Sequence, residues 1–304
     1  MKKFLIAASL VLIPVQSFAA DLPLKARPVP TAVYNWTGWY VGGNLGGGWG
    51  RNDMVSTTPN DFVTATSFFD TAGPGPAPPM RLNPQGIVGG VQVGYNWQLQ
   101  RNWLVGIEAD FDGSGVKGSS NAFVGPQFFT GTYSFDTHLN WFGTVRGRVG
   151  FLPSSNLLIY GTGGFAYGSV SHSGNFTTTE PGFGSAGISL AGVGTTFACG
   201  ADAAGGLGAV NPCFAGSSTK VLTGWTAGSG FEWAFTPNWS LKGEYLFISL
   251  QKTAITEAAL GQCIPCGGVG FAPSTFDANF GRSTFQIARV GLNYHFGGPV
   301  VAKY

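Results

Sequence analysis

The stretch from Gly86 to Gly113 predicts a β-hairpin, because two runs of alternating apolar and polar residues are joined by a short connection, 98–102. The apolar positions are Ile87, Val91, Val93, Tyr95 and Trp97 in the first run and Trp103, Val105, Ile107, Ala109 and Phe111 in the second. A period of two places the apolar side chains on one face of a strand and the polar ones on the other. So short a connection predicts that the two strands pair antiparallel.

The same pattern recurs along the chain and predicts six further strands. With the two hairpin strands these make eight, and the other six are 36–49, 138–151, 157–170, 221–233, 239–247 and 285–296. Long connections, 51–85, 113–137, 171–220 and 249–283, alternate with short turns. An even number of strands with alternating long and short connections is typical of outer-membrane barrels, which have short periplasmic turns and longer external loops. The predicted fold is therefore an all-β, eight-stranded antiparallel transmembrane barrel with four long external loops.

Composition agrees with a membrane barrel. Charged residues make up only 10% of the chain, against about 25% in a typical soluble protein. After the N-terminus, no apolar run reaches the roughly 20 residues that a membrane-spanning helix needs. Dispersed apolar residues combined with low charge favour strands that cross a membrane.

Alternation alone leaves open whether the apolar face points outward, as in a membrane barrel, or inward, as in a soluble lipocalin-like barrel. The polar face carries four acidic and four basic residues: Glu108, Asp110, Glu232, Glu244, Arg146, Arg148, Lys242 and Arg289. Charges inside a narrow lumen must be paired, because an unpaired buried charge is very unfavourable. The equal numbers of acidic and basic residues on the polar face favour the membrane barrel and predict an ion-pair cluster that plugs its lumen.

Aromatic residues near the short turns support the same choice. The predicted girdle at that membrane–water interface consists of Trp36, Trp97, Trp103, Trp233, Trp239 and Phe296. Such girdles mark the edges of the apolar band of membrane barrels. A soluble barrel leaves their placement unexplained.

The N-terminus has the features of a cleaved export signal. Lys2 and Lys3 precede the apolar run 4–15, and small residues at 17 and 19 fit a signal-peptidase site. The predicted segments are a signal peptide (1–19), a Pro-rich periplasmic linker (20–35), the barrel with its loops (36–296) and a C-terminal tail (297–304). Removal of both lysines leaves a net charge of zero, which does not suggest nucleic acid as a partner.

Several segments resemble the alphaproteobacterial outer-membrane immunogenic protein family, small eight-stranded barrels with the architecture of the OmpA transmembrane domain. The matching segments are ADLP at 20–23, WTGWYVGG at 36–43, GGFAYG at 163–168 and ARVGLNY at 288–294. The resemblance implies an abundant structural component of the Gram-negative cell envelope, located in the outer membrane and often described as a porin. Its implied partners are outer-membrane lipids, lipopolysaccharide and the barrel-insertion machinery. It implies no enzyme activity and no cofactor.

This sequence departs from the family in its tail and its cysteines. Because 297–304 follow Phe296, either Phe296 or Tyr304 completes the signal that the insertion machinery reads. Cys199 and Cys213 lie in the third predicted loop, and Cys263 and Cys266 in the fourth. In an exported protein an even number of cysteines predicts disulfides, although four thiolates leave a zinc site as an alternative.

Three functions from different classes remain open on the sequence. The first, which we favour, is a structural barrel that displays large external loops at the cell surface. The second is a small diffusion porin. The third is binding of haem or of a host surface through the loops, with His172 as a candidate residue to bind the haem iron. No catalytic motif of the G-x-S-x-G or H-E-x-x-H type occurs.

Overall fold

The computed structural model describes residues 34–61, 64–65, 69, 75–99, 102–124, 131–178, 212–259 and 275–296. Its strands are β1 (Gly38–Pro59), β2 (Met80–Leu82), β3 (Gln85–Gln98), β4 (Trp103–Val124), β5 (Gly131–Ser154), β6 (Leu157–Thr178), β7 (Pro212–Ala234), β8 (Trp239–Leu250), β9 (Thr253–Ala259), β10 (Thr275–Phe280) and β11 (Ser283–His295). Within these ranges no helix is long and apolar enough to cross a membrane. The prediction of an all-β, antiparallel chain is confirmed.

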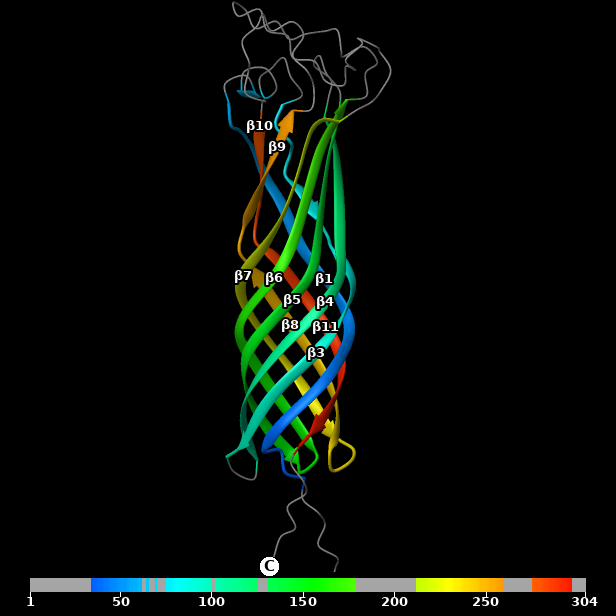
Figure 1. Cartoon of the computed structure of the whole chain (residues 1–304), viewed down its shortest axis with the longest axis vertical. Coiled ribbons are helices and arrows are strands. Elements are labelled where there is room, and N and C mark those ends of the chain that lie inside the picture. The colour runs from blue at the N-terminus through cyan, green and yellow to red at the C-terminus, as the bar shows by residue number, and fades with distance from the viewer. Residues whose placement is uncertain are drawn as a thin grey trace, which may run out of the picture.

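Eight of these strands close into a ring (Figure 1). The order is β1, β3, β4, β5, β6, β7, β8 and β11, and β11 pairs with β1 to complete it. Asn44 of β1, for example, lies between Gly90 of β3 and Gly291 of β11. A closed ring satisfies the backbone hydrogen bonds of every strand and leaves no exposed edge.

The two ends of the ring differ. The turn end carries the short connections β3–β4, β5–β6 and β7–β8. At the opposite end, which we call the far end, β9 and β10 extend the wall beyond the ring (Figure 1). There β9 continues the line of β8 after a break at 251–252, and β10 leads into β11 after a break at 281–282. Pairing of β10 with β1 and of β9 with β7 continues the sheet at the far end.

Each long connection predicted from the sequence begins and ends in strand, and the second is mostly strand, so the predicted bounds of these connections were wrong. The second predicted loop, 113–137, is occupied by the end of β4 and the beginning of β5, which pair as far as Val124 with Gly131. The third loop loses 171–178 to β6 and 212–220 to β7, and the first and fourth contain the end of β1 and strands β2, β9 and β10.

The reason is an inversion of polarity along the strands. Near the turn end, apolar side chains point outward, such as Ile107 and Val149. Toward the far end, Tyr133 and Phe135 point into the ring, whereas Asp136, the next residue along the strand, is exposed. Alternation therefore continues past the predicted ends of the strands, but with the apolar face turned inward.

Candidate functional site

A cluster of charged side chains fills the lumen on the turn-end side of the ring. All eight predicted residues lie inside and are buried, each no more than 5% exposed. Asp112 joins them from β4, and we call these nine residues the charged cluster. Asp112 was absent from the predicted cluster, although the alternation of β4 places it on the same face as Glu108 and Asp110.

Two arginines connect several strands within the charged cluster. Arg146 of β5 pairs with Glu108, with Asp110 (Nη2–Oδ2 2.8 Å) and with Glu244 of β8 (Nη1–Oε1 3.0 Å). Arg289 of β11 pairs with Glu244 (Nη2–Oε2 2.6 Å) and with Asp112 (Nη1–Oδ2 2.8 Å). These bonds join four strands of the ring through its interior.

A second group lies nearer the turn end. The guanidinium of Arg148 pairs with Glu232 (Nη1–Oε2 3.3 Å) and lies between two tyrosine rings, 4.7 Å from the centroid of Tyr40 and 5.3 Å from that of Tyr160. Glu232 also accepts a hydrogen bond from Asn293 (2.7 Å). Cation–π contacts in a site without solvent add to the stability of such a pair.

Three carboxylates of the charged cluster are close enough together to be considered as a metal site. Oxygen atoms of Glu108, Asp110 and Glu244 all lie within 4.8 Å of one another. The guanidinium of Arg146 already pairs with all three carboxylates. The three carboxylates are thus part of a salt-bridge network, and cationic side chains occupy the position in which a metal ion would bind.

Apolar layers close the lumen on both sides of the charged cluster. Toward the far end lies the middle apolar layer, composed of Val88, Val116, Leu139, Phe142, Ala166, Val170, Leu222, Leu246, Ile248, Leu250, Phe285 and Ile287. Toward the turn end lies the mouth layer, composed of Trp36, Leu104, Leu152, Leu158, Tyr160 and Ala234. Water in the lumen would have to pass both layers as well as the ion pairs.

Trp36 corrects the predicted girdle. Its side chain is fully buried in the mouth layer, where Nε1 donates a hydrogen bond to the carbonyl of Ser155 (3.1 Å). The chain before β1 turns into the mouth, and the indole packs at right angles to the imidazole of His295. Trp36 precedes the strand that begins at Gly38, so strand alternation does not determine its direction.

The other five predicted girdle residues point outward near the turn end, and each is at least 40% exposed. They are Trp97, Trp103, Trp233, Trp239 and Phe296. Trp39 joins them on β1, against Tyr95 of β3. A second belt, which we did not predict, encircles the ring closer to the far end and includes Trp49 with Tyr245, Phe111 with Trp141, and Trp225 with Phe247. The sequence contained a signal for this second belt, because Trp49 and Trp225 occupy apolar positions of the predicted strands.

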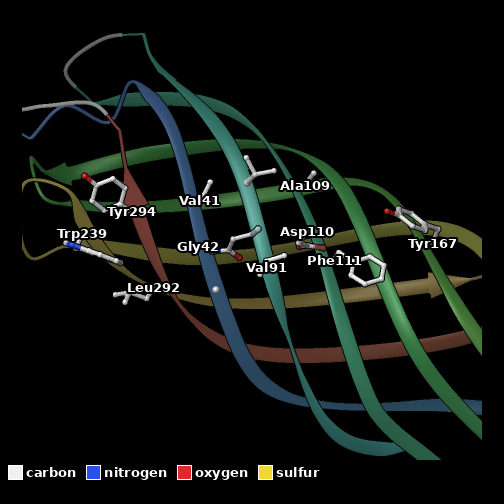
Figure 2. Close-up of a pocket in the computed structure, with 13 residues that line it drawn as sticks. Val41, Gly42, Val91, Ala109, Asp110, Phe111, Tyr167, Trp239, Leu292 and Tyr294 are labelled. Atoms are coloured by element: carbon white, nitrogen blue, oxygen red, sulfur yellow. The ribbon is translucent and has the colours of Figure 1, made fainter.

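A shallow groove of about 830 Å³ runs along the outer wall between the two aromatic belts (Figure 2). Val41 of β1, Val91 of β3 and Leu292 of β11 line it, with Trp239 at one end and Phe111 and Tyr167 at the other. Gly43 contributes to its depth, because a Cβ at this position would meet no atom closer than the carbonyl of Gly90, 3.7 Å away. The groove lies on the apolar outer face, and of the residues that line it only Asp110 belongs to the charged cluster.

The lumen at the far end holds a third apolar layer. This far layer consists of Met54, Ala77, Met80, Leu82, Tyr133, Phe135, Phe176, Phe214, Ile255, Phe276, Ala278 and Phe280. Glu257 is fully buried there, and burial raises the pKa of its carboxyl to about 8. Sequence reasoning missed this residue because it falls within a predicted loop.

The three histidines lie in different places. His172 was interpreted as a residue at the base of a loop, but it lies inside β6 and is 2% exposed, stacked on Phe280. Burial, with a smaller contribution from Lys220, lowers the pKa of His172 to about 4. His138 is on the outer face of β5, and His295 is buried near Glu232, so no histidine pair forms.

Some predictions fall on parts of the chain that the structure leaves undescribed. The side chains of Cys199, Cys213, Cys263 and Cys266 are among them, so disulfide pairing stays a prediction. The signal peptide, most of the linker and the tail also lie outside the described residues.

Comparison with known proteins gives a consistent result. The model of the family described as "Outer membrane protein beta-barrel domain" matches residues 5–296. The 31 kDa outer-membrane immunogenic protein of Brucella melitensis biotype 1 is 33% identical over 305 residues, which cover 97% of this chain and 100% of the relative. The 22 kDa outer membrane protein of Rhizobium leguminosarum bv. viciae is 38% identical over 85 residues, covering 28% and 34% of the two chains. The solved structure of OprG from Pseudomonas aeruginosa aligns over 87% of this chain and 100% of its own, at 10% identity and a TM-score of 0.39, a likeness too weak to inform function.

Proposed function

Because this chain belongs to the outer membrane protein β-barrel family, we propose that it is a closed structural barrel whose lumen does not conduct. Family membership confirms the resemblance to the outer-membrane immunogenic proteins and locates the chain in the outer membrane. The observation that carries the proposal is the charged cluster, which joins opposite walls of the ring through buried ion pairs. Breaking such a pair would leave an uncompensated buried charge, so the cluster holds the lumen shut.

The proposed orientation sets the turn end in the periplasm and the far end outside the cell, with eight strands crossing the membrane. The two aromatic belts support it. On β1 they are represented by Trp39 and Trp49, ten positions apart. At about 3.3 Å per residue and a tilt of about 40°, this spacing corresponds to roughly 25 Å, the height of the apolar band of such barrels.

The far end then forms a walled extension above the membrane, and it carries the surface-exposed role. Its outer face is polar at Asp136 and Thr219, as a wall facing water requires, while its interior is the far layer. Lipid acyl chains and lipopolysaccharide are the proposed partners of the outer wall between the belts, including the groove in Figure 2. We propose no catalytic role.

Conductance of the refolded protein in a planar bilayer tests the closed lumen. Folding is verified beforehand by a heat-dependent shift in gel mobility. We expect a silent bilayer for the wild type and openings for Arg146→Ala, which removes the central cation of the cluster. Discrete, stable openings of the wild type would overturn the proposal and favour the runner-up, a small diffusion porin.

Surface labelling of intact cells tests the orientation. An epitope tag inserted between β4 and β5, in 125–130, should bind antibody without permeabilisation. A matched tag in the turn 235–238 should bind only after the outer membrane is opened. The reverse pattern would invert the assignment of the two ends.

A further inference from the structure

Glu257 is an isolated carboxyl group inside the extension above the membrane. It is fully buried, and neither Oε1 nor Oε2 has a hydrogen-bond partner within the described part of the chain. On β9 it lies opposite Phe276 of β10, within the far layer. A buried carboxyl without a partner strongly favours the neutral, protonated form.

Two glycines provide the space that Glu257 occupies. Gly174 of β6 and Gly216 of β7 are paired neighbours. A Cβ on Gly174 would lie 2.2 Å from Oε1 of Glu257, and a Cβ on Gly216 would lie 2.9 Å from its Cα. Any larger residue at either position would therefore displace the glutamate or the strand that carries it.

The surrounding strands bring no countercharge to Glu257 among the described residues. Lys220 of β7 donates to the carbonyl of Ala254 on the exposed side (3.0 Å), and Asp277 of β10 accepts from Thr256 on the outer face. His172 of β6 is buried and held neutral by its lowered pKa. Other titratable or charged groups toward the far end of the neighbouring strands include Tyr133, Asp136 and His138 on β5, Arg81 on β2, and Arg51 and Asp53 on β1, of which the last two pair with each other.

A proline-rich strap, residues 75–82, packs over the same layer. Ala77, Met80 and Leu82 insert buried side chains into it. The strap is held by a hydrogen bond from the hydroxyl of Tyr133 to the carbonyl of Gly75 (2.7 Å) and by one from the amide of Ala77 to Thr57 (3.1 Å). Tyr133 belongs to the far layer, where burial raises the pKa of its hydroxyl, and the carboxylate charge of nearby Glu257 raises it further.

We propose that the protonation state of Glu257 controls whether the strap stays seated over the far layer. The neutral acid packs among the phenylalanines and leaves the Tyr133–Gly75 bond in place. The carboxylate form needs water, and hydrating it separates the rings on which Ala77 and Met80 rest. The extension is then a pH-dependent cap at the outer surface, while the charged cluster below keeps the barrel closed.

Hydrogen exchange of the strap amides in the full-length refolded protein tests this device. The amides of Ala77 and residues 80–82 are followed from pH 5 to pH 9 in the wild type and in Glu257→Gln, which imitates the neutral acid. Intrinsic exchange rates are equal in the two chains, so their ratio measures opening. Because one proton is released on opening, the wild-type strap should exchange faster than the variant by a factor that grows about tenfold per pH unit up to about pH 8 and then stays constant.

Asp136→Asn is the matched control, since it removes an exposed carboxyl from the outer face of β5, and it should behave as the wild type. A ratio that stays constant from pH 5 to pH 9 would overturn the proposal, and so would equal acceleration in β3 and β4, which would indicate global loosening. If Glu257→Gln does not refold, the wild type alone tests the proposal. After correction for intrinsic exchange rates, the strap amides must lose protection above pH 6.5, and the amides of β3 and β4 must not.

Discussion

Lys242 and Glu108 form an ion pair across the full width of the ring. Lys242 is on β8 and Glu108 on β4, four places apart in a ring of eight, and Nζ lies 2.7 Å from Oε1 and 2.8 Å from Oε2. The hydroxyl of Tyr40 donates to the same carboxylate (2.6 Å). A barrel held together through its interior in this way resists both flattening and hydration of its lumen.

The first prediction concerns this pair. Lys242→Met removes one partner and leaves a buried carboxylate less compensated, which should lower the free energy of unfolding by about 3 kcal/mol. Adding Glu108→Gln removes the other charge as well, and the double variant should recover most of the loss. Urea unfolding in lipid vesicles measures both. Arg51→Gln, which breaks an exposed pair with Asp53, serves as the control and should leave the stability essentially unchanged.

A larger loss in the double variant than in Lys242→Met would contradict this account. It would mean that Glu108 stabilises the fold mainly through Arg146 and Tyr40, with Lys242 as a minor partner.

The second prediction separates the mouth layer from the girdle. Trp36 is buried inside the mouth, whereas Trp97 is 43% exposed on the outer wall. Trp97→Phe should reduce the fraction of tryptophan fluorescence quenched by brominated lipids, and Trp36→Phe should leave the quenched amount unchanged. Quenching lost on replacing Trp36 would place its indole in the membrane interface, as the sequence alone suggested.

The third prediction compares two glycines of opposite orientation. A Cβ on Gly94, inside the ring, would lie 2.2 Å from the hydroxyl of Tyr40, so Gly94→Ala should push the ring away from Glu108 and lower stability by about 1–3 kcal/mol. A Cβ on Gly47, on the outer face, would meet nothing closer than 4.0 Å. Gly47→Ala should therefore be neutral within about 0.5 kcal/mol. Equal losses in thermal unfolding would show that strand flexibility, and not the contact with Tyr40, decides the outcome.

The ring and its charged interior could be predicted from the sequence because both follow from strand alternation. Ile107 and Glu108, for example, alternate on β4 and point to opposite sides as expected. Trp36 could not be placed in this way, since it lies before the strand. The extension was missed because the prediction assumed that the apolar face of every strand points outward. Tyr133 and Phe135 alternate with polar residues as regularly as Ile107 and Ala109 do, but their apolar side chains point inward. Glu257 and His172 depended on that unrecognised extension, so their burial was not foreseen.

The fourth prediction concerns the pH dependence of the extension as a whole. Glu257 has a raised pKa of about 8 in the folded chain, so its contribution to stability is present below its unfolded pKa and is lost as pH rises through about 8. His172 has a lowered pKa of about 4, so its contribution is present above about pH 6.5 and is lost as pH falls toward 4. The two slopes are each about 1.4 kcal/mol per pH unit and oppose each other between pH 4.5 and 6.5. Hydrogen-exchange protection of β9 and β10, corrected for intrinsic rates, should therefore be flat in that range and fall between pH 6.5 and 8. His172→Phe should remove the plateau, so that protection declines steadily from pH 4.5 upward. A plateau that persists in this variant would show that His172 is not the group that opposes Glu257, whereas a wild type without a plateau would show that His172 stays buried when the extension opens.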